Sequence, residues 1–305
     1  MFRGRGICCF AVMDGHGGAF VAAYLRDHLM DHLLQVPRPW SSEGLQAAVV
    51  ALDRDVRAKL AAMAPHDCIG STVAFLLMED TNAMPPDGVP VWMVHAGDTR
   101  ILVIDGDRQI QYESKDHRVG REDEKTRIVE AGGHISSDGY VDAGCCLKGL
   151  LRLNVTRSLG DPRFKKDTFR DENHQKVIAL PDVQRVVVYP GWKIFLMCDG
   201  FFESSCGSTD TWMQRLQSWV AEDANLTCRT VCGNLVGTAL KTGSKDNLSV
   251  LLLSFSRIAS SVRTRNVVEK PLKTRGKKRR SETELLGSIP KPVPPVRTRR
   301  LLVLK

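Results

Sequence analysis

Three aspartates stand where an apolar run ends or begins, each beside a glycine or an amide. They occur in Val12-Met13-Asp14-Gly15, Met197-Cys198-Asp199-Gly200 and Ser244-Lys245-Asp246-Asn247. A single Asp-Gly pair is an ordinary turn, because both residues tolerate turn conformations. Three such carboxylates near a core are different, because each is costly to bury without positive charge nearby. Hard divalent cations bind oxygen ligands from several parts of a rigid fold, so the set indicates a metal site.

Several neighbouring polar residues each admit two interpretations. His16 is either a general acid, since its ordinary pKa of about 6.5 suits that chemistry near neutrality, or a turn histidine. Asp98, in a Gly-Asp-Thr turn, is either a further ligand or only the turn residue. Arg157 either meets an anionic substrate or pairs with an acidic neighbour. Asp116-His117 and Asp161 are adequately explained as charged turns.

The positive charge of the chain is concentrated at its C-terminal end. The 305 residues carry a net charge of +8, but residues 256–305 alone hold 15 Lys/Arg against 3 Asp/Glu. The remaining residues are therefore acidic overall, with a net charge of −4. A basic domain built for nucleic-acid binding is not indicated, and the end segment has the composition of a disordered tail.

Cysteine content and hydropathy bear on the class of protein. The nine cysteines are odd in number and form no Cys-x-x-Cys pair, so neither a disulfide framework nor a zinc site is expected. Free thiols in a reducing cytosol or nucleus are the better interpretation. No apolar run approaches the roughly 18 residues of a membrane span, and residues 7–13 lack the features of a signal peptide.

Hydrophobic periodicity predicts the elements that position these residues. Helices are expected at 19–36, 43–63, 121–131, 209–220 and 226–241, where apolar residues recur at spacings of three and four. Strands are expected at 71–78, 89–96, 100–105, 183–189, 193–197 and 247–255. Residues 134–180 are polar and irregular, and we interpret them as a mobile flap near a site. The order of elements predicts one mixed domain with helices outside sheets.

Eight stretches, taken in order, resemble the metal-dependent protein serine/threonine phosphatases of type 2C. They are FAVMDGHGG at 10–18, GST at 70–72, HAGDTR at 95–100, KDH at 115–117, EAGG at 130–133, LNVTRSLGD at 153–161, CDGFFE at 198–203 and GSKDNLSV at 243–250. Each stretch alone is weak, but eight in family-like order over residues 7–255 make chance an inadequate explanation.

The resemblance implies a fold and a pair of metal ions. The fold is α+β, an α-β-β-α sandwich of two packed, mostly antiparallel sheets flanked by helices, with Mg²⁺ or Mn²⁺ at one end. By this resemblance Asp14 bridges two ions and Gly15 offers its backbone carbonyl. Asp199 and Asp246 complete the shell of the first ion. Asp98 belongs to a weaker third site together with Asp199.

The resemblance also implies the reaction. A hydroxide that bridges the two ions attacks phosphorus in line, and His16 protonates the departing serine or threonine oxygen without a covalent intermediate. Glu203 stands where the family commonly has Asp and is a candidate for the third site. Arg157 remains a candidate for substrate contact. The expected substrates are phosphorylated proteins.

One departure from the family pattern leaves alternatives open. The family has an Arg-x-x-x-Glu-Asp element upstream of the Asp-Gly-His strand, whereas only six residues precede Ile7 here. We therefore expect one or two N-terminal strands, a phosphate-binding arginine and a second-metal glutamate to be missing, and a sheet edge to be exposed. The chain is then part of a longer protein, a weakly active short form, or a non-catalytic relative that binds phosphoproteins or a partner.

The expected domain organisation follows. Residues 1–257 form a type 2C phosphatase-like domain with its flap at about 134–180, and residues 258–305 form a basic, Pro-containing tail. Lys and Arg at 273–280 are either a nuclear import signal or a solvated charge run, so cytoplasmic or nuclear residence is expected. We expect a monomer without membrane association, with nucleic-acid contact only through the tail.

Overall fold

The computed structural model describes residues 2–4, 6–63, 68–80, 85, 87–143, 151–203, 205–222 and 226–256. The predicted tail at 258–305, including the basic cluster at 273–280, lies outside the described residues. Among the described helices, none combines the length and the apolar character that a membrane span requires.

Two antiparallel sheets form the centre of the domain. The first has the strand order β1-β2-β5-β6-β13 and the second β15-β14-β7-β8. The strands of the first sheet are β1 (Phe2–Gly4), β2 (Ile7–Val12), β5 (Val73–Glu79), β6 (Val89–Ala96) and β13 (Asp182–Val188). The strands of the second are β7 (Arg100–Ile104), β8 (Ile110–Glu113), β14 (Lys193–Met197) and β15 (Val250–Ser254).

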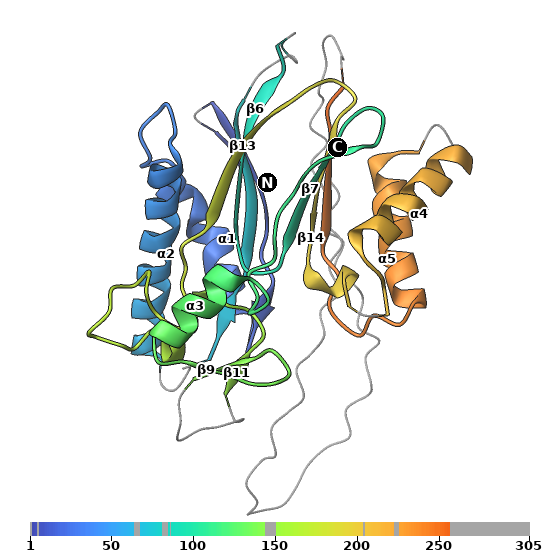
Figure 1. Cartoon of the computed structure of the whole chain (residues 1–305). Coiled ribbons are helices and arrows are strands. Elements are labelled where there is room, and N and C mark those ends of the chain that lie inside the picture. The colour runs from blue at the N-terminus through green and yellow to red at the C-terminus, as the bar shows by residue number, and fades with distance from the viewer. Residues whose placement is uncertain are drawn as a thin grey trace, which may run out of the picture.

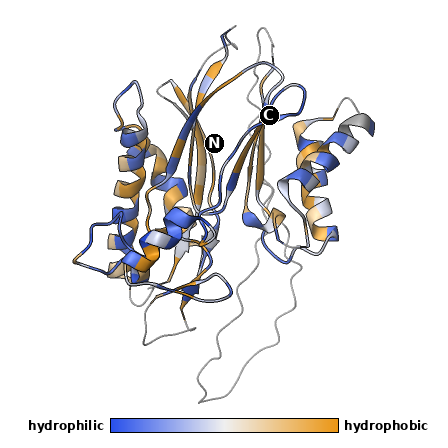
Figure 2. Ribbon diagram, viewed as in Figure 1, coloured by the Kyte–Doolittle hydropathy of each residue, from blue (hydrophilic) through white to orange (hydrophobic). Residues whose placement is uncertain are grey.

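Helices cover the outer face of each sheet, which confirms the predicted α-β-β-α sandwich (Figure 1). Helices α1 (Phe20–Leu33) and α2 (Ser42–Ala62) pack on the first sheet. Helices α4 (Thr209–Glu222) and α5 (Cys228–Lys241) pack on the second, and the short α3 (Glu122–Glu130) lies beside the small strands below. The apolar colouring follows the facing surfaces of these layers (Figure 2).

Strand β5 shows how the sequence builds the three apolar layers. Its side chains alternate between the two faces of the sheet, as the period of two requires. Phe75 and Leu77 belong to the core under α1 and α2, whereas Ala74 and Leu76 belong to the core between the two sheets. All four are fully buried. A strand covered on both faces therefore reads as a continuous apolar run.

The five predicted helices are confirmed within a few residues at each end. Of the expected apolar stripe in α2, Leu45, Val49, Leu52, Val56 and Leu60 are buried, whereas Met63 follows the last helical residue and is exposed. The Ser41 hydroxyl accepts a hydrogen bond from the Gly44 amide and so caps this helix.

The segment predicted as an irregular flap contains regular structure in its described part. Strands β9 (His134–Ile135), β10 (Val141–Asp142) and β11 (Arg152–Leu153) form a small sheet of order β11-β10-β9. Val141, Leu153 and Phe164 pack with Ile128 of α3 in a separate apolar cluster. This small core explains why a polar segment takes up a defined shape.

Strands β1 and β8 belong to the main sheets but were not expected from the sequence. Strand β1 pairs antiparallel with the first half of β2, Phe2 opposite Cys9 and Gly4 opposite Ile7, so the edge of the first sheet lies at β1. Strand β8 was not predicted, because Ile110–Glu113 is short and largely polar or exposed. It is fixed by pairing with β7 rather than by its own apolar pattern.

Candidate metal centre

The four predicted aspartate ligands meet at one end of the sandwich. Asp14 follows β2, Asp98 lies in the corner from β6 to β7, Asp199 follows β14, and Asp246 precedes β15. Antiparallel pairing places these strand ends together, since Met197 pairs with both Arg100 and Val250. The Gly97-Asp98-Thr99 corner carries the chain from one sheet to the other. We call Asp14, Asp98, Asp199 and Asp246 the aspartate cluster.

Burial and the neighbouring carboxylates raise the pKa values of Asp14 and Asp199 in the aspartate cluster. Burial, together with the charges of Asp246 and Asp98, raises the pKa of Asp14 to about 7. Burial, with Asp98, Asp14 and Asp246, raises the pKa of Asp199 to about 8. Burial also raises the pKa of Asp98. Negative charge is therefore concentrated here beyond what the protein compensates.

Arg118 is a cation in contact with this cluster. Its Nη2 donates to Oδ2 of Asp98 at 2.7 Å and to Oδ2 of Asp199 at 3.3 Å. One guanidinium does not balance four carboxylates, and the pKa values stay raised despite it. A set of convergent carboxylate oxygens with excess negative charge fits Mg²⁺ or Mn²⁺.

His16 lies beside the cluster on β3 (Gly15–His16), which pairs with β4 (Gly70–Ser71). Its Nε2 is 2.7 Å from Oδ2 of Asp161, whose side chain is fully buried. Burial by itself lowers the pKa of His16, but the Asp161 carboxylate outweighs it and the pKa is raised. The sequence therefore places His16 correctly beside the aspartates, but it does not identify the partner of the imidazole.

The remaining two predicted site residues lie in different surroundings. Glu203 is partly buried, and its Oε2 accepts the backbone amide of Lys245, next to Asp246. Arg157 is 7% exposed and pairs with acidic neighbours. Its Nε and Nη2 both donate to Glu124 Oε1 at 2.8 and 2.6 Å, and its Nη1 donates to Asp182 Oδ1 at 3.1 Å. This geometry therefore favours the interpretation that Arg157 pairs with acidic neighbours.

The comparisons with known proteins decide the family. Residues 7–248 match the family model described as Protein phosphatase 2C. The chain belongs to the protein phosphatase 2C family. Among curated relatives, Protein phosphatase 2C 1 of Paramecium tetraurelia is 30% identical over 211 residues, covering 65% of this chain and 64% of that protein. Protein phosphatase 1A of Homo sapiens is 27% identical over 262 residues, covering 81% and 62%. The matched region thus spans less than two thirds of these relatives.

Solved structures share the fold. A phosphatase from a pathogenic strain of Toxoplasma gondii superposes with a TM-score of 0.72 at 23% identity, covering 83% of this chain and 86% of that one. A sex determining protein of C. elegans superposes with a TM-score of 0.62 at 23% identity, covering 81% and 55%. At this identity the likeness concerns the architecture, which is that of the protein phosphatase 2C family.

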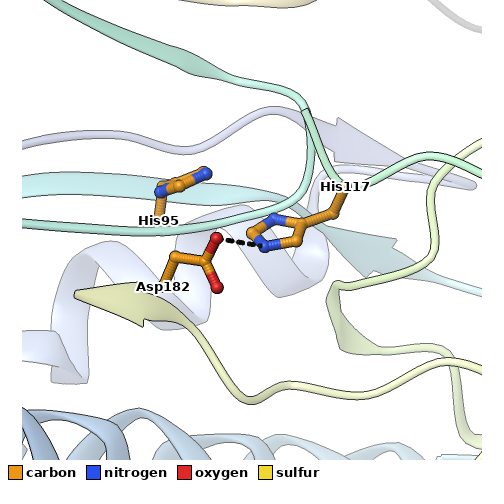
Figure 3. A group of neighbouring side chains, drawn as sticks. All are labelled: His95, His117 and Asp182. Carbon is orange, nitrogen blue, oxygen red and sulfur yellow. Dashed lines mark ion pairs between the residues drawn. The ribbon is translucent and has the colours of Figure 1, made fainter. Parts of the chain in front are cut away.

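Near the Asp98 corner lies a second group of ionisable residues, in which positive side chains balance the carboxylate. His95, His117 and Asp182 offer ligand atoms within 4.8 Å of one another (Figure 3). However, Asp182 Oδ2 accepts from Arg121 Nη1 at 2.8 Å, and its other oxygen accepts from Arg157. Two guanidiniums already neutralise this carboxylate, so the group does not favour a metal ion.

This second group contacts the corner that carries Asp98. The His117 amide donates to the Gly97 carbonyl at 3.0 Å, next to Asp98. His117 Nε2 lies 3.2 Å from Asp182 Oδ2, and burial lowers the pKa of His117. A neutral imidazole tied to both the corner and Asp182 fixes the position of Asp98.

We call Glu124 and Asp182, with Arg121, Arg127 and Arg157, the arginine network.

Proposed function

We propose that this chain hydrolyses phosphoserine and phosphothreonine in proteins in a reaction that depends on Mg²⁺ or Mn²⁺. The observation that carries the proposal is the aspartate cluster, in which four carboxylates from both sheets converge and the pKa values of Asp14 and Asp199 are raised, in a chain of the protein phosphatase 2C family. A cluster kept in this costly state is explained by cations that it binds.

The proposed ligand assignment uses the cluster together with the adjoining glycine. Asp14 and the Gly15 carbonyl would hold two ions, with Asp199 and Asp246 completing the shell of one of them. Asp98 and Asp199 would form a weaker third site, and Arg118 would leave it on binding. When bound, the ions supply Lewis-acid chemistry, because they lower the pKa of water and offset charge that builds on the phosphoryl oxygens.

The residues of this chain would do the remaining work. His16 is partly exposed beside Asp14, and its raised pKa, caused by the Asp161 carboxylate, favours the protonated imidazole. In the proposed reaction it delivers that proton to the departing serine or threonine oxygen. Leaving-group protonation matters here because an alkoxide is a poor leaving group.

The alternative, a non-catalytic phosphoprotein-binding or partner-binding relative, has less support. It rests on the expectation that the upstream Arg-x-x-x-Glu-Asp element is absent. The four aspartates and His16 are all present and convergent, and a binding protein without chemistry does not need that arrangement. Tight phosphopeptide binding in saturating Mn²⁺ without any turnover would favour this alternative instead.

The test is phosphate release from a phosphothreonine peptide by the purified chain, with Mn²⁺ and with EDTA. Asp199→Asn is the matched variant, since it removes one charge and keeps the shape of the side chain. We expect turnover only with metal, and at least a 100-fold loss (order of magnitude) in the variant, as for other lost transition-state charge stabilisation. Unchanged turnover in Asp199→Asn would exclude this site as the catalytic centre.

A further inference from the structure

The residue that holds His16 comes from a distant part of the chain. Strand β12 (Leu159–Gly160) pairs with β4, and β4 pairs with β3, so Gly160 and His16 both lie opposite Gly70. Asp161 follows β12 directly, and its Oδ2 receives the 2.7 Å contact from His16 Nε2. The small sheet therefore brings together two side chains that are 145 positions apart.

Gly70 shows how tightly this contact is built. A Cβ at this position would lie 2.0 Å from Asp161 Oδ2 and 2.5 Å from His16 Nε2. Both distances are far below van der Waals contact, so any side chain here would separate the pair. The absence of a side chain at Gly70 is what allows His16 and Asp161 to meet across β4.

Asp161 is held in an unfavourable backbone conformation. Its φ of +49° and ψ of +51° are left-handed, a region that residues other than glycine rarely adopt. Two hydrogen bonds hold this residue. The Ser158 hydroxyl donates to Asp161 Oδ2 at 2.6 Å, and the Asp161 amide donates to the Ile69 carbonyl at 2.9 Å. Backbone strain of this kind persists only where surrounding structure fixes it.

A buried ion pair from α2 fixes the same turn. Asp53 Oδ1 accepts from the Gly160 amide at 2.7 Å and from Lys165 Nζ at 2.9 Å. Lys165 Nζ also donates to the Ser158 carbonyl at 2.7 Å. The side chains of Asp53 and Lys165 are each 3% exposed. A buried pair is weak evidence for stability alone. Here the bonds to the Gly160 amide and the Ser158 carbonyl both end on the turn that carries Asp161, while Asp53 Oδ2 accepts from Arg57 Nε of the same helix at 2.9 Å.

We infer that Asp161 is the positioning residue for His16, and that the buried Asp53–Lys165 pair holds the 158–161 turn in the shape that presents Asp161. The inference rests on the proposed function. Because Asp161 accepts the hydrogen of Nε2, the ring is fixed and Nδ1 is the nitrogen that serves the reaction. As the bond between phosphorus and the departing oxygen breaks, the Nδ1 proton passes to that oxygen, and phosphorus takes its new oxygen from water.

Two substrates separate positioning of the general acid from a merely structural role. A phosphothreonine peptide expels a basic alkoxide that needs a proton, whereas p-nitrophenyl phosphate expels an anion that is already stable. For Asp161→Asn we expect kcat to fall about 100-fold on the peptide, within the range of general acid catalysis, but less than about 10-fold on the aryl ester. We expect KM to stay unchanged. Equal losses on both substrates, or no loss on either, would overturn the inference.

Matched variants make the result specific. Asp138→Asn is the control, because Asp138 is an exposed carboxylate in the neighbouring segment that pairs with Arg152, and no change is expected. Asp53→Asn should reproduce the substrate-dependent loss of Asp161→Asn. Where either variant fails to fold, Ser158→Ala decides. Ser158→Ala removes the side-chain hydroxyl that donates to Asp161 Oδ2. It should lower kcat several-fold on the peptide and leave kcat on the aryl ester unchanged.

A readout independent of turnover distinguishes this inference from the proposed function. In metal-free protein, nitrogen NMR of the His16 ring should show the hydrogen on Nε2 in the wild type and a changed distribution in Asp161→Asn. Calorimetric Mn²⁺ affinity should be equal in the two proteins. If the wild type releases no phosphate, the proposed function fails and the NMR result decides the positioning. An unchanged Nε2 hydrogen in Asp161→Asn contradicts it.

Discussion

The aspartate cluster and the arginine network are neighbouring groups of charges with opposite electrostatic states. In the cluster Asp98 is buried, Asp14 and Asp199 are half-buried and Asp246 is exposed. In the cluster, four carboxylates face a single guanidinium, and the pKa values of Asp14 and Asp199 rise to about 7 and 8. In the network, burial would raise the pKa of Glu124, but hydrogen bonds from Arg127 and Arg157 outweigh burial and lower it to about 2.

This difference in charge balance suits the aspartate cluster to cation binding and the arginine network to a structural role. Charges that the protein compensates internally stabilise the fold in the state described, whereas charges that it leaves uncompensated destabilise the metal-free protein and favour a cation. Asp182 belongs to the compensated group, because His117, Arg121 and Arg157 outweigh burial and hold its pKa well below the usual range. The balance of charge, rather than the number of carboxylates, therefore distinguishes the candidate metal centre from the arginine network.

The largest effect on stability is expected from breaking the network. Arg157→Met removes the guanidinium that contacts both Glu124 and Asp182. It should lower the free energy of unfolding by about 3–5 kcal/mol, as for other buried pairs that lose one partner. Urea unfolding followed by circular dichroism measures this.

Two control variants serve for comparison with the stability loss of Arg157→Met. Arg152→Met removes an exposed guanidinium from its pair with Asp138 and should cost less than about 1 kcal/mol. In EDTA, Asp199→Asn should leave the unfolding free energy unchanged or raised, because it relieves repulsion in the cluster. A loss of similar size in Arg157→Met and Asp199→Asn would remove the distinction between the two groups.

Metal binding should reverse the instability of the cluster. Mn²⁺ at about 100 times its dissociation constant should stabilise the folded protein by about 2.7 kcal/mol, a rise in melting temperature of roughly 5–10 °C for a domain of this size. Differential scanning calorimetry with Mn²⁺ and with EDTA measures it. Asp199→Asn should reduce the rise strongly, whereas Asp138→Asn should retain it. An equal rise in both variants would place the bound metal elsewhere.

The smallest effect concerns pH in the metal-free protein. The folded-state pKa values of Asp14 and Asp199 are raised, so between about pH 4 and pH 8 the folded state binds more protons than the unfolded state. Stability contributed by these groups is then lost as pH rises from about 5 to about 8. Glu124, with its lowered pKa, contributes stability above about pH 4.5 and loses it only toward pH 2.

Comparison with Asp199→Asn isolates the pH effect, because buried histidines titrate in the same range. Stability of the wild type in EDTA should fall more steeply with pH than that of the variant, and saturating Mn²⁺ should abolish the difference. Parallel pH profiles in EDTA would show that the aspartates do not repel one another as described.

The sequence by itself predicts the elements and the aspartates that the structure brings together. Apolar spacing predicts α1 and α2, since the stripe that includes Leu25 and Leu52 is local and periodic and ends in the core. Asp14, Asp199 and Asp246 were found because each lies at the end of an apolar strand, and strand ends of an antiparallel sheet meet at its edges.

Only the tertiary structure decided which charges compensate one another. Arg118 reaches Asp199 from 81 positions away, Arg157 reaches Glu124 from 33, and Asp161 reaches His16 from 145. No local pattern encodes these pairings, because a charged turn looks the same in sequence whether its partner is solvent or a buried imidazole. The chain order fixes where each side chain stands, and the packing of two sheets with a third small one fixes which side chains meet.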